Sequence, residues 1–156
     1  MMARWVRLVT PLVLIALVGC EPAMVDDPEA LEAKTPYDSD LPVPRRFEPM
    51  VGSSYRRVPG SYREAKLIYA GRATAEAVVQ FAIDRMIQAG WRETFMNSRP
   101  LRSEIRFVKP GGLSTPPERC TVIVASQGDR TRLELHVERA PDIDKALPGP
   151  SGNSVQ

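Results

Sequence analysis

Two cysteines and one histidine are the side chains of this sequence best suited to act as nucleophiles or proton carriers, and they lie apart. Cys20 follows an oily N-terminal run, whereas Cys120 and His136 fall in alternating apolar and polar stretches near the other end. His136 stands among charged neighbours with no serine or cysteine beside it, which indicates an exposed structural residue. Cys120 opens an apolar series with Val122 and Val124, which indicates a small buried side chain rather than a reactive thiolate. We therefore expect no catalytic residue here.

Motifs that bind metals, nucleotides or other cofactors do not occur in the sequence. A single histidine without any CxxC pair gives no basis for a zinc site. The pair Gly111-Gly112 lacks the rest of a phosphate-binding loop. Two cysteines about a hundred residues apart do not form the pattern of a disulfide scaffold. The expectation is a protein with no cofactor and no metal.

Arginine is the residue type whose distribution points to a function. Several arginines stand beside aromatic residues or cluster near one predicted hairpin: Arg45, Arg46, Arg56, Arg57, Arg99, Arg102 and Arg106. Because guanidinium groups bind phosphates and carboxylates, these side chains predict an anionic partner. Lipid head groups, cell-wall polymers and an acidic protein surface all fit, and a soluble surface that is merely rich in arginine is the alternative.

Residues 1–20 have the order of a secretory signal peptide. Arginines come first, an apolar run follows over residues 8–18, and the small Gly19 precedes Cys20. The run is about eleven residues long, whereas a helix that crosses a ~30 Å hydrocarbon core needs about twenty. Pro11 also disfavours a permanent membrane helix. The sequence thus predicts export and cleavage after Gly19.

The tetrapeptide Leu17-Val18-Gly19-Cys20 resembles the lipobox of bacterial lipoproteins. The resemblance covers only the first twenty residues. It implies that the Cys20 thiol receives a diacylglycerol and that residues 1–19 are removed as a signal peptide. Two or three acyl chains then anchor the protein to the membrane. Glu21, where aspartate would retain such a protein in the inner membrane, implies the outer membrane facing the periplasm, so nucleic acid is not an expected partner.

Charge divides the remaining chain into three parts. Residues 21–43 contain seven acids against Lys34 alone, together with several prolines, so residues 20–43 are predicted to be an unfolded tether. Such a tether would reach roughly 25–30 Å as a random coil. Residues 44–139 carry fifteen arginines and two lysines against ten acids, which predicts a basic domain. Residues 140–156 are predicted to be a disordered tail.

Hydrophobic periodicity predicts an α+β domain. Apolar residues recur at three- and four-residue spacing over 74–91, where Thr74 can cap a helix and Gly90 can end it. Period-two alternation predicts strands over the ranges 63–71, 91–97, 103–109, 120–126 and 131–139, with one more strand near 53–58. The predicted fold is a two-layer sandwich, with one helix packed on an antiparallel sheet of four to six strands in the order β-α-β-β-β-β.

These features together favour a membrane-anchored, non-enzymatic lipoprotein. Its α+β domain would bind a protein or an anionic component of the cell envelope. Two alternatives stay open on the sequence alone: a small envelope hydrolase or redox enzyme built on Cys120 or His136, and a purely structural lipoprotein.

Overall fold

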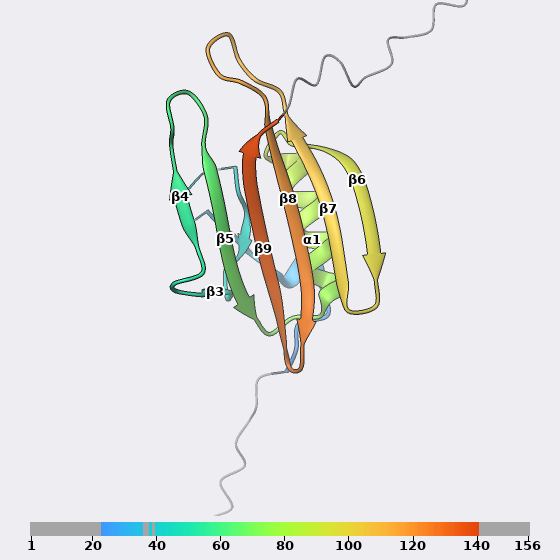
Figure 1. Ribbon diagram of the computed structural model, residues 1–156. Helices are drawn as coiled ribbons and strands as arrows, with labels where there is room; N and C mark the ends of the chain where they lie inside the picture. Colours follow the sequence, from blue (N-terminus) through green and yellow to red (C-terminus); the bar gives the residue numbers. More distant parts are fainter. Residues whose placement is uncertain (1–22, 36–37, 39, 141–156) are drawn as a thin grey trace, which may run out of the picture.

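The computed structural model describes residues 23–35, 38 and 40–140, and the account below is confined to them. One helix packs against one face of a mainly antiparallel seven-stranded sheet, and a two-stranded sheet lies beside them (Figure 1). The fold is therefore α+β, as the periodicity predicts. Within these residues, no helix is both long and apolar enough to cross a bilayer.

The large sheet is built around its C-terminal hairpin. Its order is β3-β5-β9-β8-β7-β6, and β4 pairs with β5 beside β3. The bounds of the strands are β3 Glu48–Pro49, β4 Tyr55–Arg57, β5 Glu64–Gly71, β6 Arg92–Arg99, β7 Arg102–Lys109, β8 Glu118–Gln127 and β9 Arg130–Arg139. All of their pairings are antiparallel. The last described strand, β9, thus lies between β5 and β8, near the middle of the sheet.

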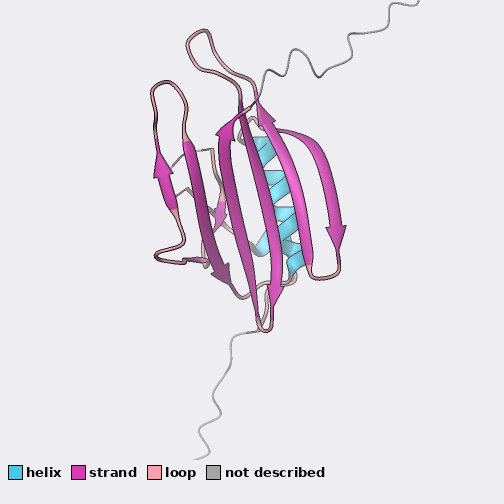
Figure 2. Cartoon of the chain, in the orientation of Figure 1, coloured by secondary structure: helices cyan, strands magenta, loops and turns pink. Residues whose placement is uncertain are grey.

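Helix α1 (Ala75–Gln88) begins and ends where the sequence predicts. The Thr74 side chain accepts a hydrogen bond from the Ala77 amide, and Gly90 takes a positive φ of 88° after the last turn. The buried face of the helix, which includes Val78 and Phe81, packs on the inward series of the sheet strands. The helix covers this face alone, and within the described part of the chain no second layer lies on the other face of the sheet (Figure 2).

The N-terminal segment packs onto the domain, so the prediction that it cannot bury enough apolar surface to fold is wrong for its described part. A 3₁₀ turn at Pro28–Ala30 is followed by β1 (Ala33–Lys34) and β2 (Val43–Pro44), which pair with each other. Leu31, Leu41 and Val43 are at most 4% exposed and belong to the main core. A few well-spaced apolar residues therefore outweigh an acidic average composition.

The sheet is wider than predicted because short segments add to its β5 edge. The predicted strand near residues 53–58 is confirmed as β4, but the two-residue β3 has no periodicity that could reveal it. The order from β5 through α1 to β9 is the predicted one. At the C-terminal end, Ala140 is 3% exposed and donates a backbone hydrogen bond to Pro117, so the packed chain extends one residue beyond the predicted boundary.

The two ends of the sheet differ in what they carry (Figure 1). The lower end holds the β6–β7 and β8–β9 turns. The first described residues also lie there, because Val25 forms a bridge to Ala73 and Ala23 lines a hollow together with Asp129 and Arg130. The upper end holds the β4–β5 and β7–β8 loops and Ala140.

Candidate functional site

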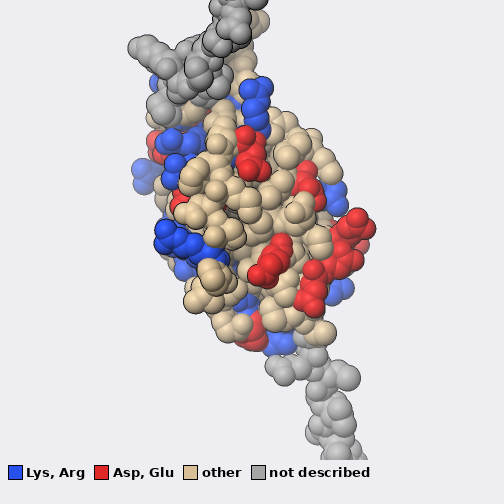
Figure 3. All heavy atoms as spheres, turned by 90° about the vertical axis from the view of Figure 1, so that its right-hand side faces the viewer, with Lys and Arg blue, Asp and Glu red and all other residues tan. Residues whose placement is uncertain are grey.

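The uncovered face of the sheet carries more basic than acidic side chains. Successive side chains of a strand point to opposite faces of the sheet. The cross-strand register therefore assigns to this open face the side chains that alternate with those packed in the core. Its basic residues are Arg57, Lys66, Arg92, Arg99, Arg102, Arg106, Arg119, Arg130 and Arg132, and its acids are Glu48, Glu64, Glu104, Glu134 and Glu138. Seen from the β6 side, lysine and arginine gather toward the open face and acids toward the helix side (Figure 3).

Part of this basic surface is already neutralised by its own glutamates. Arg106 donates to Glu104, with a shortest N···O distance of 2.7 Å, and Arg119 donates to Glu138 at 2.6 Å. Arg106 also lies over the ring of Phe95, with its Cζ atom 4.6 Å from the ring centroid. These arginines are held by groups of the protein, so they are poorly suited to bind a further anion.

A second set of basic side chains on the open face forms no ion pair with any other described residue. It consists of Arg57, Lys66, Arg92, Arg99 and Arg102. Arg99 and Arg102 stand directly opposite each other across the β6–β7 pair. Like charges in this position repel, because the facing Cβ atoms of a cross-strand pair lie only about 5 Å apart.

The same line across the sheet continues to a third arginine. Arg102 faces Ala125 on β8, and Ala125 faces Arg132 on β9. Arg132 pairs with Glu134 at 3.1 Å, but its buried Nε atom has no hydrogen-bond partner among the described residues. We call Arg99, Arg102 and Arg132 the arginine row. With only Ala125 between Arg102 and Arg132 along this line, the row places several hydrogen-bond donors close together on the open face.

Arginine plays a different part at the upper end, on the helix side of the sheet. Arg63 donates to both carboxylate oxygens of Asp40 at 2.7 Å and to Glu118 at 2.8 Å. Lys109 donates to Asp40 at 2.6 Å, and the Trp91 indole N–H donates to the Asp40 carbonyl at 2.8 Å. We call these five residues the ion cluster.

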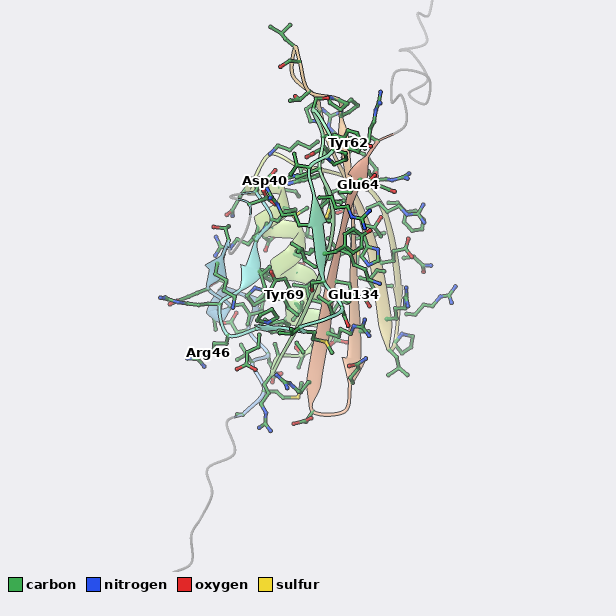
Figure 4. All side chains as sticks on the ribbon, turned by 60° about the vertical axis from the view of Figure 1, so that its left-hand side comes forward. Asp40, Arg46, Tyr62, Glu64, Tyr69 and Glu134 are labelled. Atoms are coloured by element: carbon green, nitrogen blue, oxygen red, sulfur yellow. The ribbon has the colours of Figure 1, made fainter. Side chains whose placement is uncertain are left out.

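The ion cluster is only slightly exposed. The side chains of Arg63, Asp40 and Glu118 are 13%, 15% and 18% exposed. Arg63 and Lys109 both lie near the ring of Trp91, at 5.8 and 5.6 Å from its centroid. Figure 4 places Asp40 high on the helix side and Glu134 on the open side of the sheet. The cluster therefore joins the N-terminal segment to β5, β7 and β8.

The charges of the ion cluster are strongly stabilised. Burial raises the pKa of the Asp40 carboxyl, but hydrogen bonds and positive charge from Arg63 and Lys109 outweigh burial and lower it to about 2. Burial lowers the pKa of Arg63, whereas hydrogen bonds from this guanidinium to Asp40 and Glu118 raise it above its usual value. Both groups are therefore charged throughout the physiological range, as a permanent structural contact requires.

The structure separates the other predicted arginines from the open face. Arg45 pairs with Glu32 at 2.7 Å, and Arg56 pairs with Asp38 at 3.0 Å on the inner side of β4. Arg46 lies low on the helix side (Figure 4), where it lines a hollow of about 380 Å³ with Arg72. Four predicted residues, namely Arg57, Arg99, Arg102 and Arg106, do share the open face.

Cys120 and His136 occupy the places that their sequence neighbours predict. Cys120 is fully buried, and burial raises the pKa of its thiol far above the usual value, so the thiolate is not available at neutral pH. His136 is partly exposed on the open face, with its Nε2 atom 3.1 Å from Glu134. Among the described residues, no group of three potential ligands could hold a metal ion. Gly19 and Cys20 lie outside the described residues.

Two features of the site were missed in the sequence. Arg132 alternates with the core series of β9, so its face could be predicted, but its position beside Arg102 depends on the register of three strands. The ion cluster joins residues up to 78 positions apart, from Asp40 to Glu118, and no local pattern signals such a contact.

No known protein family matches this chain, and no curated protein is significantly similar to it in sequence.

Proposed function

We propose that the chain is a non-enzymatic lipoprotein of the bacterial envelope, anchored through a lipid on Cys20, whose open sheet face binds an anionic envelope component. The observation that carries the proposal is the excess of basic side chains on this face, several of which have no carboxylate partner there. A protein surface that needs only solubility gains nothing from two opposed arginines without a counter-charge.

The lipobox resemblance supports the location of the protein. The tetrapeptide Leu17–Cys20 follows a basic start and an apolar run of about eleven residues. Glu21 supports an outer-membrane location facing the periplasm, a setting in which anionic lipids and cell-wall polymers are abundant. The proposal is of binding rather than catalysis, because Cys120 is a buried, protonated thiol.

Substitution of the lipidation site tests the anchor. The variant Cys20→Ala should lose its signal-peptide processing or leave the membrane fraction, while the wild-type chain stays there. The measurement is fractionation of cells followed by mass analysis of the protein. Unchanged processing and fractionation of the variant would contradict the anchor.

Retention on immobilised polyphosphate tests the open face. The variant Lys66→Gln/Arg92→Gln/Arg99→Gln/Arg102→Gln should elute at lower salt than the wild-type protein, because it loses phosphate contacts. The matched control, Arg45→Gln/Arg46→Gln/Arg56→Gln/Arg85→Gln, removes the same number of basic residues, all of which lie off this face. If both variants elute at the same salt concentration, the charge of the whole protein is responsible and the open face has no special role.

A further inference from the structure

The packed N-terminal segment brings the domain close to its anchor. Val25 donates a backbone hydrogen bond to Arg72 and accepts one from Thr74, so this residue is fixed at the lower end of the sheet. Five residues lead from Cys20 to Val25, and a fully extended chain of that length spans at most about 18 Å. A lipid on Cys20 would therefore hold the lower end next to the membrane surface.

An apolar side chain projects from this end between two basic ones. The turn Arg99-Pro100-Leu101-Arg102 connects β6 to β7, and we call it the basic turn. Leu101 is 71% exposed, although its carbonyl accepts a hydrogen bond from the Ser126 amide at 3.1 Å. The backbone is thus held to β8 while the leucine side chain points into solvent.

The charges around the basic turn favour an anionic surface. Arg99 and Arg102 have no carboxylate partner among the described residues, and Arg132 continues the same row. Two acids of the lower end are paired with arginines: Asp129 binds Arg72 at 2.9 Å, and Glu48 lies 3.7 Å from Arg130. A row of phosphates would relieve the repulsion between the opposed arginines, and each basic residue at an anionic membrane adds affinity.

Two further acids at the lower end should affect how the domain tilts on the membrane surface. Asp26 and Asp27 directly follow Val25 in the chain, and the 3₁₀ turn after them packs on helix α1, on the side away from the open face, where Glu29 lies beside the last turns of the helix. An anionic surface repels these acids and attracts the basic turn. The open-face side of the lower end should therefore approach the membrane more closely than the helix side does.

We propose that the basic turn rests on anionic phospholipids of the membrane that holds Cys20, with Leu101 among the lipid chains and Arg99 and Arg102 on head-group phosphates. This proposal rests on the proposed function, and it identifies phospholipid as the anionic component that the arginine row binds. The apolar tip and flanking charges are the combination by which peripheral segments bind lipid surfaces.

Thiol accessibility in the full-length chain tests this contact. The variants Leu101→Cys and Leu113→Cys place a thiol at the lower end and on the exposed β7–β8 loop of the upper end, respectively. In membranes opened by sonication, a water-soluble maleimide should label Leu101→Cys about tenfold more slowly than Leu113→Cys, because Arg99 and Arg102 still hold the turn, and the thiol at its tip, against lipid. After detergent solubilisation the two rates should become equal.

Charge removal shows whether the arginines hold the turn. Adding Arg99→Gln/Arg102→Gln to Leu101→Cys should remove the protection, whereas adding Arg57→Gln/Arg92→Gln, from the upper part of the open face, should leave it intact. In vesicles of phosphatidylcholine alone, the reconstituted lipidated protein should lose protection that vesicles with phosphatidylglycerol restore.

Each other outcome counts against the proposal. Equal labelling of the two thiols in membranes would overturn it while leaving the anchor and the open face untouched. Protection that persists in detergent would show that a protein, rather than lipid, covers Leu101. Recovery of the wild-type chain in the soluble fraction would overturn the proposed function itself, and this contact with it.

Discussion

The ion cluster and the arginine row both contain arginine, but in opposite electrostatic surroundings. In the ion cluster, Arg63 is shared by Asp40 and Glu118, and all three are nearly buried. In the arginine row, Arg99 faces Arg102 with no carboxylate between them. A guanidinium saturated by the protein contributes to stability, whereas one that repels its neighbour is free to bind an anion. Whether an arginine already has a carboxylate partner therefore says more about its availability to an anion than the number of arginines does.

Removal of Asp40 should produce the largest effect. The variant Asp40→Asn leaves Lys109 and part of Arg63 without their carboxylate inside a mostly buried cluster, and we expect a loss of about 3 kcal/mol in the free energy of unfolding. Urea denaturation at pH 7 measures it. Polyphosphate retention by the folded variant should equal that of wild type. Weaker retention would mean that the ion cluster also contributes to anion binding.

Acid should remove a related but smaller share of stability. The pKa of Asp40 is lowered to about 2 from 3.8, so its contribution is complete above about pH 4 and is lost as the pH falls through 2. The shift corresponds to about 2 kcal/mol. The stability difference between wild type and Asp40→Asn should therefore shrink between pH 4 and pH 2 in urea titrations. A difference that stays constant over this range would show that the carboxylate charge is not what stabilises the cluster.

Relief of repulsion in the arginine row should give a small change of the opposite sign. The variant Arg102→Gln removes one of two opposed charges, which should raise the free energy of unfolding by about 0.5 kcal/mol. The same variant should elute from polyphosphate at lower salt. Stabilisation without weaker retention would mean that the row does not bind anions, and destabilisation would mean that Arg102 has a structural partner.

The smallest effect should come from an arginine that belongs to neither region. Arg45 and Glu32 form a salt bridge in which both side chains are about 70% exposed, at 71% and 69%. Solvent screens such a pair, so the urea midpoint of Arg45→Gln should not change measurably. The same measurement on Arg106→Gln provides a comparison with an open-face arginine, because Glu104 and Phe95 already hold the guanidinium of Arg106.

The periodic parts of the fold were accessible from sequence, and the contacts between distant parts were not. The stripe of α1 and the alternation of β9 identify those elements because one face of each is buried. In contrast, the acidic composition around Leu31 and Leu41 predicts disorder, since composition averages away the few apolar residues that reach the core. The arginines were recognised as a group, but only the strand register separates Arg56, which faces inward, from Arg57, which faces outward.

The position of β9 has a consequence for when the protein can fold. This strand is the last described element of the domain, yet it lies between β5 and β8. Without it, the strands on its two sides are not joined. The seven-residue pairing of β5 with β9 links residues at least sixty positions apart, and such long-range pairing forms late in folding. A chain that emerges N-terminus first therefore cannot complete its sheet until residue 139 is free. The topology therefore delays completion of the sheet until the sequence of the whole domain is available for pairing.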